Sequence, residues 1–308
     1  MRRSGVTGVP ARRFLLVALC LAPIAVVAAG CFSATPTQED LLVNAARALS
    51  GTKSVHVDAA VQVSVTRQTT RTESWSAELR GGIAKPAMSL AGAVAVDKAG
   101  GEPRTYPFAL RLAAKTLYAQ IKGGWYSASL RDLRRQSAAA ASAAAGGKPR
   151  SLIAKLRRLR AAQEIAKHAF RGTVTRGPEL DGQKTWEWQG TVDPEGAVAM
   201  AAKYGGDRAT LTPGKRRQAV AALEQLARVC RITVVAGSDG KPRRLEITVD
   251  ADRQQAGKLA RAAGQAGDAD AVHARLRLDL SHWNEPVEAT APARARPIEQ
   301  LLKGVVGG

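Results

Sequence analysis

The stretch VHVDAAVQVSVT, residues 55–66, alternates aliphatic and mostly polar side chains without a break. Val55, Val57, Val61 and their neighbours at every second position are apolar, while His56 begins the intervening polar series. Successive side chains of a strand point to opposite faces of a sheet. A period of two over this length therefore predicts a strand with one buried and one solvated face, which is typical of antiparallel sheets.

The same alternation returns on both sides of a central region with helical patterning. Further strands are expected around residues 75–80, 88–96, 106–112, 117–121, 185–192, 230–234, 244–250 and 272–280. Residues 137–149 read as a mobile loop or frayed helix, and residues 251–270 as an exposed excursion. The predicted fold class is α+β, with an antiparallel sheet and a small set of helices.

Cap residues indicate where those helices begin. Asp40 is the expected cap of a helix running to about Leu49, and Ser151 that of a helix running to about Ala169. Asp193-Pro194 begins a short helix that continues to about Tyr204. Thr212 followed by Pro213 is a cap with proline at the first helical position, which predicts a helix to about Ala227.

The first 30 residues have the order of a secretory signal. Four arginines precede an apolar run at residues 14–29, which is short for a spanning helix and ends in Ala28-Ala29-Gly30-Cys31. Small residues followed by cysteine predict a lipoprotein signal at residues 1–30, cut before Cys31, whose thiolate accepts the lipid. The alternatives are an ordinary cleaved signal with an incidental cysteine, or an uncleaved anchor.

This leader predicts an exported protein held by lipid on the outer face of the cytoplasmic membrane. The weak likeness of residues 12–16 to a twin-arginine signal leaves both export routes open. Residues 31–38 form a short tether, and residues 39–308 are expected to form one domain. After cleavage Cys230 is the one cysteine besides Cys31, so an intrachain disulfide is not expected.

The order of predicted elements resembles the LppX/LprAFG family of actinobacterial lipoproteins. The segments LYAQIKGGWY (residues 117–126) and LDLSHWNEPV (residues 278–287) carry the likeness most clearly. Residues 41–57, 172–194 and 229–249 complete it. The resemblance implies a LolA-like fold, in which a strongly curved antiparallel half-barrel wraps over helices and leaves an apolar cavity for the acyl chains of a lipid or lipoglycan.

We expect such a cavity to be lined by apolar residues of the strands. The candidates are Val57, Val61, Leu117, Ile121, Trp186, Trp188, Ile232 and Leu278. For the two tryptophans, simple core packing is the alternative interpretation. Small side chains in the helices could widen a cavity or merely bring the helices closer together.

The sequence contains no recognisable catalytic constellation. The four histidines have no metal-ligand spacing, and no phosphate-binding loop or nucleophile elbow is present. Cys230 falls on an apolar strand face, which favours a buried, inert thiol over a nucleophile. We therefore expect a protein that is not an enzyme and needs no cofactor or metal.

The charge of the chain suggests a second function. Removing the four leader arginines lowers the net charge from +20 to +16. Outside the membrane nucleic acid is not an expected partner, whereas anionic lipid headgroups and acidic wall polymers are. The alternative to a lipid carrier is thus an envelope scaffold that binds such anions or a partner protein through a basic surface, and compositional drift would explain the same charge.

Overall fold

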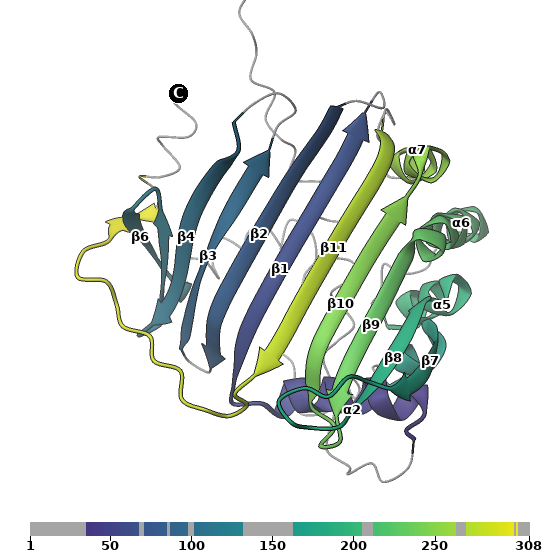
Figure 1. Ribbon diagram of the computed structural model, residues 1–308, viewed down its shortest axis with the longest axis horizontal. Helices are drawn as coiled ribbons and strands as arrows, with labels where there is room; N and C mark the ends of the chain where they lie inside the picture. Colours follow the sequence, from purple (N-terminus) through teal and green to yellow (C-terminus); the bar gives the residue numbers. More distant parts are fainter. Residues whose placement is uncertain are drawn as a thin grey trace, which may run out of the picture.

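The computed structural model describes residues 35–67, 71–84, 87–97, 102–131, 163–204, 212–262, 269–298 and 300. Within them, twelve strands form one open, curved sheet in the order β12-β6-β5-β4-β3-β2-β1-β11-β10-β9-β8-β7 (Figure 1). The strands are β1 Ser54–Arg67, β2 Arg71–Ala84, β3 Met88–Asp97, β4 Arg104–Ala113, β5 Thr116–Ile121, β6 Gly124–Ser129, β7 Phe170–Arg176, β8 Thr185–Val192, β9 Cys230–Gly237, β10 Pro242–Ala251, β11 Ala269–Ser281 and β12 Arg296–Pro297. All neighbours are antiparallel except β12 and β6, so a mostly antiparallel sheet with helices, the predicted α+β class, is confirmed.

The two predicted strand groups join through their first and last long members. β1 pairs with β11 from His56↔Ser281 to Arg67↔Ala269, and it pairs with β2 on its other side. The strand that the alternating stretch predicts is therefore central in the sheet. This position explains its length, because both of its edges are hydrogen-bonded.

Two glycines, Gly81 and Gly92, lie where the backbones of β2 and β3 approach each other closely. A Cβ atom added at Gly81 would overlap the carbonyl oxygen of Ser89, and one added at Gly92 would overlap that of Glu78. Gly81 also has a φ of +147°, which side-chain-bearing residues rarely adopt. A glycine within a strand marks a bend or a close backbone approach, and here the two glycines accommodate the close approach of β2 and β3.

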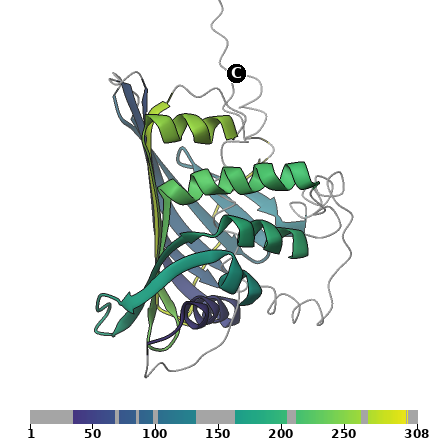
Figure 2. The ribbon, with the colours of Figure 1, turned by 90° about the vertical axis from the view of Figure 1, so that its right-hand side faces the viewer.

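Four helices belong to the described part of the chain. They are α2 Gln38–Gly51, α5 Pro194–Tyr204, α6 Pro213–Val229 and α7 Arg253–Ala262, with a further helical stretch at residues 163–168. Figure 2 shows them on one side of the sheet, stacked above one another. The contacts of α2, α6 and α7 with the sheet are mainly to β7–β11.

The helix starts confirm two of the four cap predictions, Asp193 before α5 and Thr212 before α6, and Ser151 lies outside the described residues. Thr212 accepts a hydrogen bond from the backbone of Lys215 at the start of α6, which continues to Val229. Asp40 was expected to cap the first helix, and this prediction is wrong. Thr37 is the cap of α2, and Asp40 is the third helical residue of the same capping box. The Asp40 carboxylate accepts a hydrogen bond from the backbone N–H of Thr37, so each of the two side chains bonds to the backbone of the other residue.

The prediction for residues 251–270 is wrong over much of its length. Ala251 ends β10, α7 follows, and β11 begins at Ala269. Ala256 packs against Val229 and Ala251. The prediction missed this contact because it depended on large apolar residues, and alanine is small. Residues 137–149 and most of the helix expected at residues 152–169 lie outside the described residues.

After β11 the chain returns across the sheet to β12, which lies beside β6 (Figure 1). The backbone N–H of Asn284 donates to the carbonyl of Ser54 over 2.8 Å. Arg111 donates to the carbonyl of Thr290, and β12 then pairs with β6. The short β12 pairs with the outer edge of β6 at Tyr126 and Ser127, where a free edge would invite pairing with other chains.

Candidate functional site

An apolar row crosses the sheet on the side that α2 covers. Directly opposite residues of neighbouring strands point to the same face. The row through Trp188 continues, strand by strand, through Val234, Leu245, Leu278, Ala59, Leu79, Gly92, Phe108 and Ile121. We call the face that carries this row the inner face.

All eight predicted cavity residues lie on the inner face. Val57 and Val61 flank Ala59 at a spacing of two, Ile232 and Trp186 have the same relation to Val234 and Trp188, and Leu117 pairs with Leu112 beyond Phe108. Their placement on one face follows from the register. Whether they contact a ligand stays a prediction.

Burial divides these residues into two groups. Trp188 and Ile232 are 1% and 5% exposed and pack in a core cluster against Leu41 and Ala45 of α2. Val57 is buried in a second cluster with Val55 and Leu280. Residues of this first group are core in the structure as it stands, because other side chains of the chain already fill the space around them.

Trp188 is the most tightly held of the group. Its indole N–H donates to the side-chain oxygen of Gln38 over 3.1 Å, and its ring meets that of Phe170 edge to face at 5.9 Å between centroids. A Cβ added at Gly172 or Gly190 would collide with the indole. These two paired glycines make the space that the ring occupies.

The second group remains half-buried: Val61, Leu117, Ile121, Trp186 and Leu278. Trp186 has the guanidinium of Arg176 5.0 Å from its ring centroid, so one of its faces is against a surface cation. Leu278 and Trp186 border the core cluster. Leu117 and Ile121 lie on β5, well away from the helices that contact β7–β11.

The helices that the structure describes contact mainly β7–β11, so they leave the inner face of β2–β6 less covered than the other half of the sheet. Ile83 and Tyr106, which are 41% and 43% exposed, both point to this side by register with Val55 and Val61. Between them lie half-buried Leu79, Val94 and Phe108. Leu90 on the same face is buried, while exposed Ile83 and Tyr106 make this apolar face a candidate binding surface.

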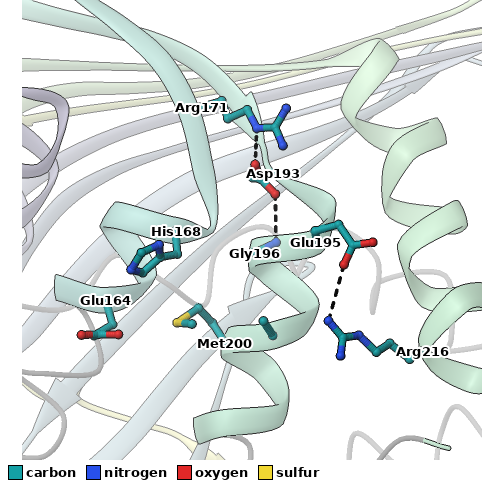
Figure 3. Close-up of a pocket in the computed structure, with 9 residues that line it drawn as sticks. Glu164, His168, Arg171, Asp193, Glu195, Gly196, Met200 and Arg216 are labelled. Carbon is teal, nitrogen blue, oxygen red and sulfur yellow. Dashed lines mark hydrogen bonds and ion pairs between the residues drawn. The ribbon is translucent and has the colours of Figure 1, made fainter. Parts of the chain in front are cut away.

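A second feature is an open polar cleft of about 480 Å³ beside α5 (Figure 3). It is lined by Glu164, His168, Arg171, Asp193, Glu195, Gly196, Ala199, Met200 and Arg216. None of the eight predicted residues lines it. The sequence pattern indicated Asp193 only as the start of a helix. The other lining residues come together at the cleft through tertiary packing.

Asp193 organises this cleft. Its carboxylate accepts the backbone N–H of Gly196 over 2.8 Å at the start of α5, and it forms an ion pair with Arg171. Burial raises the pKa of Asp193, but the Gly196 hydrogen bond and the Arg171 guanidinium outweigh it, so that pKa lies below its usual range. Asp193 is therefore a charged cap with a structural role.

The remaining charges of the cleft are paired in the same way. Arg216 lies 3.5 Å from Glu195, and Lys203 donates to Glu164 over 2.9 Å. The Lys203 hydrogen bond and charge hold the pKa of Glu164 below its usual range. Among the residues that the structure describes, no three His, Cys, Asp or Glu side chains gather as a metal site.

Cys31 lies outside the described residues. Cys230 is 1% exposed within the core cluster, which confirms that this thiol is buried. His273 is exposed on the opposite face of the sheet and contacts Asp250 over 2.7 Å.

Comparisons with known proteins add little beyond these observations. No protein-family model and no curated protein matches the chain. Among solved structures, it is similar to a LolA superfamily protein from Nitrosomonas europaea at 9% identity and a TM-score of 0.19, over 83% of this chain and 96% of that one. A beta-barrel-like protein with a domain of unknown function from Brucella abortus follows at 10% identity and a TM-score of 0.22, over 75% and 100% of the two chains.

Scores this low carry no argument about ligand or family. The LolA-like fold and the likeness to the LppX/LprAFG lipoproteins therefore stay predictions from the sequence. In the described part of the chain, no helix combines the length and apolar character that a membrane crossing requires.

Proposed function

We propose that this protein holds an acyl chain of a lipid or lipoglycan against the inner face of its sheet. The observation that carries the proposal is the apolar inner face, which continues past the helix-covered core onto β2–β6 with Ile83 and Tyr106 exposed. An acyl chain needs no specific polar contact, since each methylene removed from water contributes about 0.8 kcal/mol. The half-buried group, with Leu117 and Ile121, is the wall that we expect it to touch.

In this proposal the protein is an exported carrier or sensor without catalytic activity. The signal at residues 1–30 and the lipid on Cys31 would keep it at the outer face of the cytoplasmic membrane, where lipids are both supplied and received. The paired charges of the polar cleft support a structural role for that cleft. No cofactor or metal belongs to the proposal.

Native mass spectrometry tests this function on the protein purified from its own host, with an ordinary cleavable signal in place of residues 1–30 and Cys31→Ser to remove its own lipid. We expect a co-purifying mass of an acyl lipid that survives gentle activation. Reproducible absence of such a mass, in material that unfolds cooperatively, would refute the proposal. A carrier that releases its lipid during purification is covered by adding a fluorescent fatty acid and measuring binding directly.

A further inference from the structure

The two sides of the molecule differ sharply in charge. On the outer face of β2, β1, β11 and β10, arginine and acidic residues alternate across the strands. Arg80 pairs with Asp58 at 2.9 Å, and Arg244 and Arg277 both pair with Asp279 at 2.6 Å. The outer face of the sheet is thus internally neutralised.

The helices that stand off the sheet are strongly basic instead. α5, α6 and α7 together contain eight Lys or Arg residues and two Glu residues. The excess positive charge of the described chain therefore concentrates on this helical layer. Three of these cations, Lys203, Arg216 and Arg253, form ion pairs with acidic residues.

The direction of the helices places much of this charge at one end. α5 follows directly on β8, α7 follows β10, and α6 runs straight into β9. The last turns of α5 and α7 and the first turn of α6 are therefore the ends away from the sheet, and Figure 2 shows these ends pointing the same way. We call them the distal ends.

The distal end of α6 is unfavourable for the helix itself. Lys215, Arg216 and Arg217 occupy its exposed first turn, which contains no acidic residue. A helix N-terminus already carries partial positive charge, so cations there destabilise a helix. Arg216 lies 3.5 Å from Glu195, while within the described residues Lys215 and Arg217 have no ion-pair partner.

We infer that the distal ends of α5–α7 dock on a bilayer surface rich in anionic phospholipid. The argument is charge complementarity: exposed Lys215 and Arg217 lie at a helix N-terminus without an ion-pair partner among the described residues, and negative headgroups would offset their mutual repulsion. Each basic residue near such a surface contributes about 1 kcal/mol, or about fivefold in binding. The inference rests on the proposed function, because a carrier must bring its acyl chain to a bilayer.

Vesicle co-sedimentation tests the inference with matched variants of the chain. All proteins begin at residue 31 and carry Cys31→Ser, so that neither the apolar leader nor a lipid of their own contributes. The test variant is Lys215→Gln, Arg216→Gln and Arg217→Gln together. The control removes the same charge at exposed Lys115, Lys122 and Lys184, which lie in turns of the sheet.

We expect tighter binding to phosphatidylcholine vesicles that contain phosphatidylglycerol than to those that lack it, and weaker binding as salt rises. The α6 variant should lose between about 25-fold and 100-fold of the binding that depends on anionic lipid, while the control loses little. Equal losses in both variants, or wild-type binding by the α6 variant, would overturn the inference. The inference would also be overturned if a soluble anionic polymer, at the same concentration of charge, competed for the protein as well as anionic vesicles do. That result would assign the surface to a polymer.

Two further measurements keep the outcome interpretable. Thermal unfolding should show the α6 variant at least as stable as wild type, because the substitutions remove repulsion at a helix N-terminus. Fluorescent fatty-acid binding should be unchanged in the α6 variant. A chain that binds anionic vesicles but no fatty acid would refute the proposed function alone, and the reverse result would refute docking alone.

Discussion

Replacing Trp188 separates the structural from the ligand-contacting residues of the inner face. A fully buried indole of about 200 Å² contributes about 5 kcal/mol at 25 cal/mol/Å², and a half-buried one about half of that. Trp188 is 1% exposed and also donates to Gln38, whereas Trp186 is half-buried two residues away. Trp188→Ala should thus cost about 4–5 kcal/mol, in the usual range for such truncations, and Trp186→Ala about 2 kcal/mol.

Urea unfolding of the two variants beside wild type measures this difference. Trp188→Phe is a useful intermediate, because it keeps a ring against Phe170 while leaving the Gln38 oxygen without its donor. We expect it to cost between about 1 and 3 kcal/mol. Equal costs for the two alanine variants, or a larger cost at Trp186, would refute the assignment of Trp188 to the core.

Three further predictions concern stability. Gly92→Ala should destabilise the fold by about 1–3 kcal/mol, because its Cβ would meet the Glu78 carbonyl. Gly257→Ala lies in open space within α7 and should instead stabilise the fold by about 0.5–1 kcal/mol. Urea unfolding that reverses this order would contradict the close-approach argument. Asp193→Asn keeps a capping side chain but loses the charge, so it should be less stable than wild type at neutral pH. Because the pKa of Asp193 is lowered in the folded state, the stability that its charge provides is present above the unfolded pKa and is lost as pH falls through the folded pKa. If wild type still melts at a higher temperature than Asp193→Asn below the folded pKa, the charge is not the cause. Thr37→Ala should cost about 1 kcal/mol through the capping box, and an unchanged melting temperature would rule that contribution out.

Much of the sheet could be predicted because alternation is a local property. The odd positions of residues 55–65 face inward wherever the strand is placed, so the inner face could be assigned before its neighbours were known. The pairing of β1 with β11 could not, since no local pattern specifies which distant strand is the partner. α7 was missed for a related reason: among its residues 253–258, whose burial is described, Ala256 is the buried one, and alanine contributes little to an apolar pattern.

The site was predicted as a face but not as two zones. Trp186 and Trp188 are equivalent in the sequence, and only the position of α2 over β8–β10 makes one of them core. The polar cleft was not predicted, because Arg171 and Asp193 are separated in the chain and meet only through the β7–β8 pairing. Side-chain periodicity identifies a face, whereas tertiary contacts decide which part of it stays open.

The most direct test of the central claim is fatty-acid affinity in two lysine variants. Ala77 faces inward opposite Val94, and Ala95, also half-buried, faces outward opposite Ser76 on the adjoining strands. An ammonium on the inner face would keep water against at least two methylenes of a bound chain, which amounts to about 1.6 kcal/mol or roughly 15-fold. We predict that Ala77→Lys binds a fluorescent fatty acid at least about tenfold more weakly than wild type, while Ala95→Lys binds as wild type does. Equal affinity in both variants, whether retained or lost, would contradict a binding site on the inner face.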